Sequence, residues 1–421
     1  MKGSKLLKNE YVFSILSRFA SVALSLLQSV LVARYLGKAL QGVSAYITSI
    51  TNVGAIVITF GMHQAYPYFR KKLGREAIFH DYMSLIVGLY ALFLALGCAL
   101  AFSLPVSAEV RAAIILIPFF GYSKIVAYVC LVEMPNVRNL WWTLAGVAEV
   151  IFVALLWHFV ERGLGSVIAI LLFIEAFRGV AYTILLRPRI RLHRGLLPMA
   201  AELGKYGFFP MLALLMTTLN YKIDVLMLRQ YSYITDGMIG VYSIGIQMAE
   251  RIIMIPDTLK GVLVSRLAKG SDEHEVANVC RIAFWSSCLM CLAFLALGRF
   301  VIGLLYGAEY SGAYEALLIS SFGTIAISYF KLIAQYNIVN KRQILNVAML
   351  SAAIVTDVVF NLLFIPLWGI NGAAFATGLG NLVCGLVFVI WFVRRTHIPA
   401  GEMIVPQKKD IDAVKRLLKR R

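Results

Sequence analysis

Charged residues and catalytic signatures are both scarce in this sequence. Only 15% of the 421 residues are charged, against about a quarter in an ordinary soluble domain. A glycine-rich phosphate loop of the ATPase type is absent, so ATP is not expected to drive the protein directly. No serine, histidine and aspartate set and no carboxylate pair stands out, and no loop is large enough for the external domain of a membrane-embedded glycosyltransferase. The sequence therefore does not predict an enzyme.

Metal sites and disulfides are not predicted either. The six histidines are scattered without metal-ligand spacing, and the six cysteines lie in or beside apolar segments. Cys288 and Cys291 stand on one hydrophobic stretch with no histidine nearby, which favours packing over metal binding. No cofactor is predicted, and coupling to a proton or sodium gradient is a hypothesis.

Apolar residues are abundant: they make up 60% of the chain, and the mean hydropathy is +0.79. No soluble core buries so much apolar surface, so the surrounding solvent must be lipid. Spanning about 30 Å of hydrocarbon takes about 20 apolar residues as a helix, and alternating ten-residue segments typical of a barrel are absent. The sequence predicts an all-α polytopic protein with spans near residues 10–34, 42–66, 80–103, 110–132, 139–159, 165–187, 206–229, 238–264, 280–304, 313–336, 344–367 and 371–394.

The basic residues predict the orientation of these spans. Most of the 40 lysines and arginines fall in the two termini and the even-numbered loops, which the positive-inside rule assigns to the cytoplasm. The formal charge of +18 therefore follows from membrane orientation, and it does not indicate nucleic-acid binding. Residues 1–10 are polar and basic with no cleavage site after them, which indicates a retained first span. The tail from Lys408 to Arg421 is predicted either to lie on anionic headgroups or to serve topology alone.

An internal repeat appears at a separation of about 200 residues along the chain. Because six spans per half is an even number, the repeats are predicted to be parallel and related by a pseudo-two-fold along the membrane normal. This predicts a six-helix lobe over 1–195, a second over 196–398 and a basic tail over 399–421. The matching pairs include Gly42-Val43 with Gly240-Val241, Ala108-Glu109 with Ala308-Glu309, and Arg138-Asn139 with Arg342-Gln343.

The first span carries a continuous polar stripe. Ser14, Arg18, Ser21, Ser25 and Gln28 are spaced 4, 3, 4 and 3 residues apart, which puts them on one helical face. Such a stripe with a cation lines either a hydrated cavity or an interhelical hydrogen-bond seam, and the arginine favours the cavity.

Other spans also carry polar residues where lipid is expected. Glu175 and Arg178 are three apart in the sixth span and are predicted to pair with each other as a structural element, while Lys222 and Lys260 either snorkel to the interface or serve the cavity. Further candidates for binding an anion in the cavity are Lys124, Gln247, Arg251 and Lys331. The acids predicted to lie deep enough for ion coupling are Asp224, Glu250 and Asp357.

Three stretches carry a resemblance to a known family: ARYLGKALQGVSAY (33–46), LLYGAEYSGAYEALLI (304–319) and IPLWGINGAAFATGLG (365–380). With twelve spans, the chain resembles the Wzx-type oligosaccharide flippases, in the superfamily that also holds the multidrug antiporters of the MATE family. The resemblance implies two six-helix lobes, a MATE-like fold and alternating access. It also implies basic cavity residues that hold a diphosphate and sugars; Arg18 fits that role, and Arg251 is a plausible partner.

The resemblance further implies a cargo and a location. The cargo is a short glycan on undecaprenyl diphosphate, moved from the cytoplasmic to the periplasmic leaflet of the bacterial inner membrane for O-antigen, capsule or exopolysaccharide assembly. Membrane lipids, a polysaccharide polymerase and chain-length proteins are the implied partners. Three alternatives stay open: a MATE-like cation-coupled multidrug antiporter, a lipid II flippase, and an accessory membrane subunit of a polysaccharide synthase.

Overall fold

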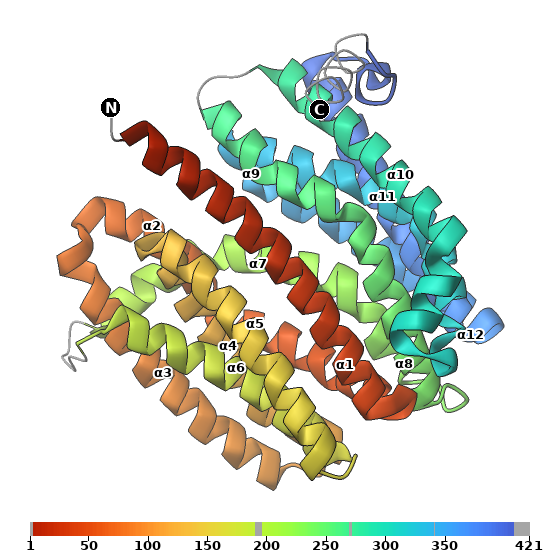
Figure 1. Ribbon diagram of the computed structural model, residues 1–421. Helices are drawn as coiled ribbons and strands as arrows, with labels where there is room; N and C mark the ends of the chain where they lie inside the picture. Colours follow the sequence, from red (N-terminus) through yellow and green to blue (C-terminus); the bar gives the residue numbers. More distant parts are fainter. Residues whose placement is uncertain (1–2, 190–195, 269–271, 341, 408–421) are drawn as a thin grey trace. The chain divides into compact units, whose positions relative to one another are not determined.

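The computed structural model describes residues 3–189, 196–268, 272–340 and 342–407, and for residues 3–22 only the course of the helix. All regular structure in these ranges is helical, as predicted. The helices are α1 (Gly3–Thr59), α2 (Met62–Leu73), α3 (Arg75–Ser103), α4 (Ala108–Glu133), α5 (Pro135–Phe159), α6 (Leu164–Leu186), α7 (Leu196–Leu228), α8 (Asp236–Ala249), α9 (Met254–Ala268), α10 (Glu273–Tyr306), α11 (Ala313–Val339) and α12 (Gln343–Thr396), in the order shown in Figure 1.

Within the described residues, ten helical segments are long and apolar enough to cross a membrane, so the protein is a multi-pass membrane protein. Two of them, Ala23–Leu73 and Gln343–Thr396, contain 51 and 54 residues, enough for two crossings each. Gly37 interrupts α1 with φ 70°, and Gly369 interrupts α12 with φ 57°. Since glycine adopts positive φ without steric cost, both residues serve as the hairpin points between successive spans. Counted in this way, the helices are consistent with the twelve predicted spans.

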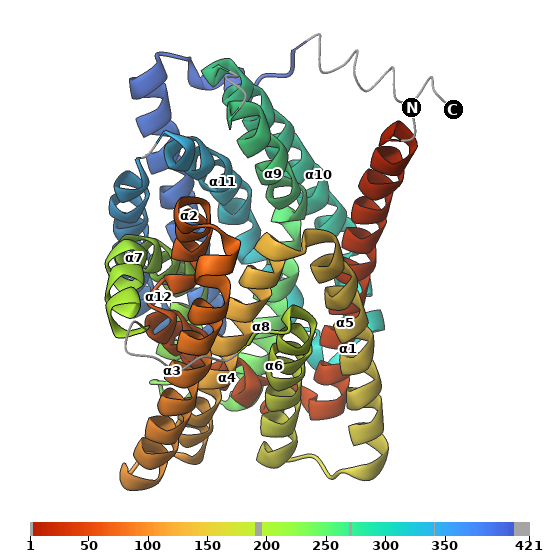
Figure 2. The same cartoon turned by 90° about the vertical axis from the view of Figure 1, so that its left-hand side faces the viewer.

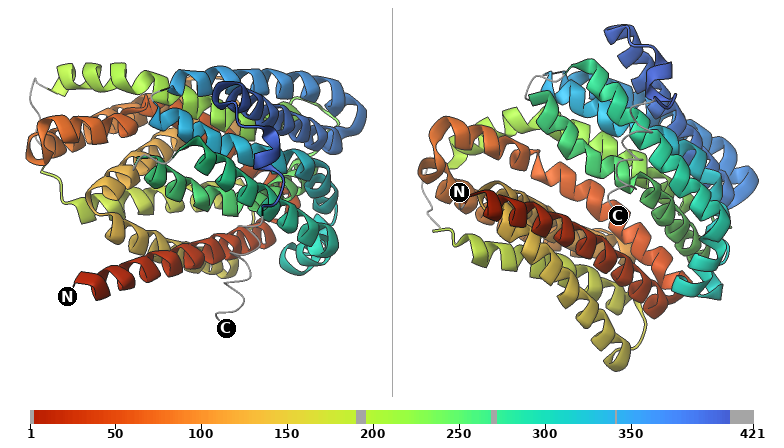
Figure 3. Two further views of the ribbon diagram at one scale, coloured as in Figure 1. Left: turned by 90° about the horizontal axis from the view of Figure 1, so that it is seen from above. Right: turned by 45° about the horizontal axis from the view of Figure 1, so that its top comes forward.

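The chain forms two compact units, residues 1–240 and 241–421. In the first unit α1 packs against α4, α5 and α7, and α4 packs against α3 and α6. Figures 2 and 3 show α1 alongside α5. The division into six-helix lobes over 1–195 and 196–398 stays a prediction.

Two predicted spans contain a break that the sequence did not predict. The second span turns at Phe60 and Gly61, which both have positive φ and separate α1 from α2. A Cβ on Gly61 would overlap the carbonyl oxygen of Gly207 in α7, so the turn depends on close backbone contact between two glycines. The eighth span is interrupted by a 3₁₀ turn, Glu250–Ile253, between α8 and α9.

The second unit is built around α11, which packs against α9, α10 and α12. Much of α10 instead exposes large apolar side chains such as Leu289 and Phe300, as expected for a helix that faces lipid. The segment after α12 lies on α10 and α11: buried Arg281 donates to the carbonyl oxygen of Glu402 at 2.5 Å, and Tyr329 donates to that of Met403. The first part of the predicted tail over 399–421 is thus held to these helices at Glu402 and Met403.

Candidate functional site: charged networks inside the helices

Four charged side chains lie in the central third of their helices in the first unit. Lys124 belongs to α4, Glu149 to α5, and Glu175 and Arg178 to α6. The four helices α1, α4, α5 and α6 pack against one another, so these charges come from neighbouring helices. Because burying a charge inside a membrane is costly, such a set is retained only where its members compensate one another or serve a function.

Arg178 is the centre of this network. Its Nη2 donates to Glu149 Oε2 at 2.8 Å, and its Nε lies 2.7 Å from Glu149 Oε1. Its Nη1 lies 3.8 Å from Glu175 Oε1, the partner predicted from sequence spacing. The side chain of Glu149 is completely buried and that of Glu175 is 13% exposed. The predicted Glu175–Arg178 pair therefore exists as the longer of two contacts, and Glu149 is the closer partner.

Both acids of this network have additional donors. The hydroxyl of Ser123 in α4 donates to Glu175, and the side-chain amide of Gln28 in α1 donates to Glu149. The guanidinium of Arg178 also lies 4.5 Å from the ring centre of Trp142, an arrangement in which the ring face stabilises the cation. The network thus connects α1, α4, α5 and α6 through charged and polar side chains.

Lys124 lies in the same unit and donates its hydrogen bond to a neutral side chain. Its Nζ donates to Asn52 Oδ1 at 2.8 Å, and Asn52 Nδ2 in turn donates to the carbonyl oxygen of Thr48. Glu175 and Lys222 lie close enough to act electrostatically on its charge. An amide acceptor is neutral, so it does not cancel the positive charge of the lysine as a carboxylate would. The charge of Lys124 therefore remains available to attract an anionic ligand.

A second charged cluster lies in the second unit. Lys331 Nζ in α11 lies 3.1 Å from the carboxylate of Asp257 in α9, and Lys260 Nζ lies 2.6 Å from the same carboxylate. Two cations share one anion, which leaves one formal positive charge. Lys331, a predicted cavity residue, is only 14% exposed, whereas Lys260 and Asp257 are each about one-third exposed.

The predicted coupling acids occupy three different environments. Asp224 in α7 is buried and accepts from the amide of Val225 at 2.8 Å. Asp357 in α12 is buried and accepts from the side-chain amide of Asn361 at 3.1 Å. Glu250 is half-buried in the 3₁₀ turn that also contains Arg251.

The structure brings some predicted site residues together and leaves others apart. Ser25 and Gln28 are half-buried on α1, and Gln28 reaches Glu149. Gln247 is half-buried in α8, one turn before Glu250 and Arg251. The side chains of Arg18 and Ser21 lie outside the described residues.

Sequence reasoning missed Glu149 and Asn52. Glu149 was detectable, because it is a carboxylate in the middle of an apolar span and therefore meets the criterion applied to the basic residues. Asn52 gave no comparable signal, since a single amide in a helix commonly bonds to its own backbone, as Asn52 also does.

Comparison with known proteins identifies one family and a common fold. A family model described as "Polysaccharide biosynthesis protein" matches residues 31–315. A search of curated proteins gives no match. The solved structure of lipid II flippase MurJ in an inward closed conformation is similar with a TM-score of 0.71 and 15% identity, over 93% of this chain and 89% of that one.

Two further solved structures share the fold. An inward-facing multidrug resistance MATE family transporter of the MOP superfamily gives a TM-score of 0.62 and 13% identity, over 90% of this chain and 94% of that one. A MOP superfamily transporter from Pyrococcus furiosus gives a TM-score of 0.55 and 13% identity, over 92% of this chain and 94% of that one. At these identities the likeness shows the fold alone, which this chain shares with these three transport proteins.

Proposed function

This chain belongs to the polysaccharide biosynthesis protein family, and from that membership we propose that it moves a lipid-linked glycan across a membrane. The cargo is an oligosaccharide repeat unit on undecaprenyl diphosphate, flipped from the cytoplasmic to the periplasmic leaflet by alternating access for O-antigen, capsule or exopolysaccharide assembly. The observation that carries the proposal is the family match over 31–315 on a helical membrane chain with a MOP-superfamily fold.

The chemistry of the cargo accounts for the basic residues inside the helices. A diphosphate carries negative charge that hydrocarbon does not accept, so its passage needs a hydrated groove with cations. Arginine binds phosphate oxygens through two parallel N–H groups, and lysine acts as a point charge. We assign to this cationic groove the predicted residues Arg18, Ser21, Ser25, Gln28 and Lys124, together with Gln247, Arg251 and Lys331.

The proposal includes a membrane arrangement. Residues 1–195 and 196–398 form two lobes that alternate access, and residues 399–421 form a basic tail on the cytoplasmic surface. Both termini are cytoplasmic, because the basic residues gather on that side of the predicted spans. The membrane is the bacterial inner membrane, as the resemblance to the oligosaccharide flippases implies. A polysaccharide polymerase and chain-length proteins act on the delivered glycan.

Ion coupling is the second part of the proposal. Asp224, Glu250 and Asp357 are the predicted coupling acids, and the geometry of the first unit adds Glu149 and Glu175. The last two carboxylates share the single guanidinium of Arg178, so their cluster carries one formal negative charge when both are ionised. A proton or a sodium ion would neutralise that charge, which supports a coupling role for this network.

The Arg18→Ala variant tests the proposed role of the α1 face in living cells. We expect glycan export to stop while membrane insertion and protein abundance remain normal, because the variant removes only a cation that contacts the cargo. Export is measured by surface glycan, and abundance by quantifying the protein in membranes. Loss of the folded protein would contradict the cavity role and support a structural hydrogen-bond seam on α1.

A further inference from the structure

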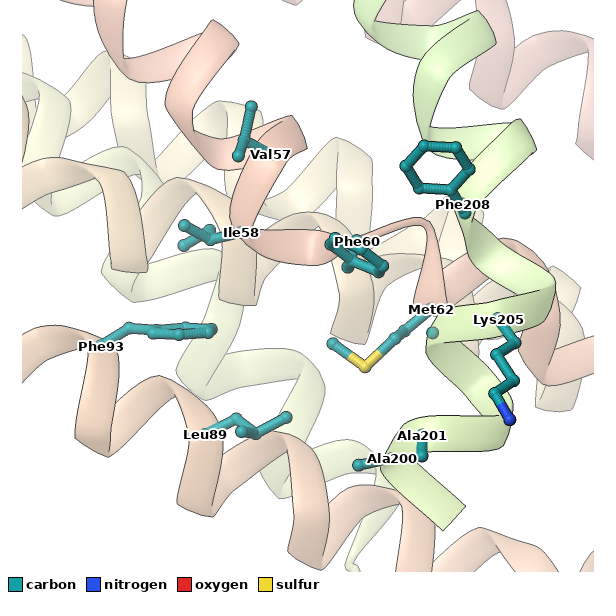
Figure 4. Close-up of a pocket in the computed structure, with 11 residues that line it drawn as sticks. Val57, Ile58, Phe60, Met62, Leu89, Phe93, Ala200, Ala201, Lys205 and Phe208 are labelled. Carbon is teal, nitrogen blue, oxygen red and sulfur yellow. The ribbon is translucent and has the colours of Figure 1, made fainter. Parts of the chain in front are cut away.

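An apolar cavity of about 640 Å³ opens on the first unit, apart from the charged network. Figure 4 shows side chains from the end of α1, the start of α2, α3 and α7 converging on it. Its volume lies within the range of ordinary small-molecule sites, which is about 300–1,000 Å³. The residues that line it are Val57, Ile58, Phe60, Met62, Leu89, Phe93, Ala200, Ala201, Gly204, Lys205 and Phe208.

The break between α1 and α2 builds this cavity. Phe60 and Gly61 both have positive φ, so the chain turns there and α2 leaves in a new direction. The contact of Gly61 with Gly207 holds the turn against α7. Phe60 and Phe208 pack with ring centres 6.0 Å apart, and both remain about two-fifths exposed at the edge of the cavity. A continuous helix across residues 42–66 would not turn at this point.

The charge on the lining is confined to one residue. Among the eleven lining residues only Lys205 is charged, and Lys205 is exposed on α7. The neighbouring Tyr206 stacks on Tyr68 of α2 with ring centres 4.7 Å apart, which brings the basic last turn of α2 close to this part of α7. In that last turn, Lys71 and Lys72 are exposed. The exposed acid Glu202 precedes Lys205 by three residues on α7, so the surroundings carry both signs of charge, while the lining itself holds one cation among apolar residues.

The lining residues belong to membrane-spanning helices. Phe93 belongs to α3 and Lys205 lies seven residues into the apolar span Pro198–Leu228. The site therefore combines one cation with apolar walls, which fits a molecule with an anionic head and a hydrocarbon chain.

We propose that this cavity binds one acyl chain of an anionic glycerophospholipid, with the lipid phosphate on Lys205. A free phosphate would leave the apolar walls unused, and a neutral lipid would leave Lys205 without complement. Phe60, Val57 and Phe208 are exposed at the cavity, so a ligand can enter it without a change of fold. This lipid site goes beyond the proposed function, because its occupant is a membrane lipid and not the cargo.

Native mass spectrometry of the full chain in detergent tests the proposal. The purified protein is titrated with phosphatidylglycerol or with phosphatidylcholine of identical chains. We expect phosphatidylglycerol to be retained about fivefold better, which is the contribution of one basic residue at an anionic surface. Lys205→Ala is expected to reduce its retention to the level of phosphatidylcholine. The matched variant Lys72→Ala, which removes an exposed lysine outside the lining, is expected to keep most of the preference.

Two further arms of the experiment test whether the lipid chain occupies the cavity itself. Ala201→Trp is expected to fill the cavity and lower the retention of both lipids without lowering the melting temperature in detergent; Ala201→Leu serves if the larger variant is unstable. Equal retention of both lipids by the wild type, or an unchanged preference in Lys205→Ala, would overturn the proposal. Displacement of phosphatidylglycerol by an equal concentration of undecaprenyl phosphate would overturn it in favour of a cargo-chain site. The readout is independent of transport, so it is separate from the test of flipping.

Discussion

Arg178 lies closer to Glu149, which is 29 residues away on α5, than to Glu175, which is three residues away on its own helix. The separations are 2.7 Å and 3.8 Å. Packing of α5 against α6 therefore decides which acid is the main partner of the guanidinium. Because Glu149 is completely buried, its charge depends on this contact more than that of Glu175 does.

Glu149→Gln is predicted to destabilise the protein more than Glu175→Gln. Removing one partner of a buried ion pair costs about 3–5 kcal/mol, because the remaining charge stays buried without its counterion. Arg178 keeps Glu175 in the first variant and the closer Glu149 in the second, so the free energy of unfolding should fall further in the first. Unfolding in detergent measures both, with the exposed Glu161→Gln as a control that should change little.

A double variant sharpens this test. Arg178→Met combined with Glu149→Gln should be less destabilised than Arg178→Met alone, since the double variant leaves no ionised Glu149 in the core. A double variant more unstable than the single one would refute the assignment of Glu149 as the main partner of Arg178.

Gly42 and Gly240, which are equivalent in the predicted repeat, are in direct backbone contact. A Cβ on Gly42 would overlap the carbonyl oxygen of Asp236, and one on Gly240 would overlap that of Lys38. Gly42→Ala is therefore predicted to lower the free energy of unfolding by about 3 kcal/mol, the upper range for overpacking a close contact.

Gly88→Ala in α3 is the matched control for this glycine contact. A Cβ on Gly88 meets nothing within 4 Å, so the better helix propensity of alanine should stabilise the protein by up to about 1 kcal/mol. Equal effects of the two substitutions on thermal unfolding would show that the contact at Gly42 does not limit stability.

The spans could be predicted from the sequence because a helix surrounded by lipid requires a continuous run of apolar residues. The breaks at Gly37 and Gly369 coincide with interruptions of those runs, so both hairpins were predictable. The turn at Phe60 and Gly61 was not, because the run is apolar through residue 66 and the turn depends on Gly207, almost 150 residues later. Local hydropathy contains no information about such a contact.

The charged residues of the candidate site were predictable from the sequence, but most of their partners on other helices were not. Charges inside spans are visible in the sequence, which is why Lys124 and Lys331 were identified. Their partners Asn52 and Asp257 lie on other helices, at separations of 72 and 74 residues, and only packing brings them together. The Glu175–Arg178 contact was predictable, because both residues lie on one face of the same helix, α6, and their spacing is visible in the sequence.

Lys331→Gln and Asp257→Asn are predicted to change cargo binding in opposite directions. The first variant removes a cation from the cluster in the second unit, and the second removes the anion that offsets Lys331 and Lys260. Binding of a short-chain polyprenyl diphosphate should weaken in Lys331→Gln and tighten in Asp257→Asn. Equilibrium binding at two salt concentrations measures both effects, which should shrink as salt screens the charges. Changes of the same sign would contradict the assignment of Lys331 to the groove.

The most direct measurement is a reconstituted-liposome assay of the accessibility of a polyprenyl-diphosphate oligosaccharide. It compares the wild type with the Arg18→Ala, Arg251→Ala double variant, after both are shown to be folded and inserted. We predict that the wild type moves the glycan lipid between leaflets and that the double variant does not. Folded wild type that leaves the glycan lipid in place while it exports an organic cation would contradict the flippase function and establish a cation antiporter.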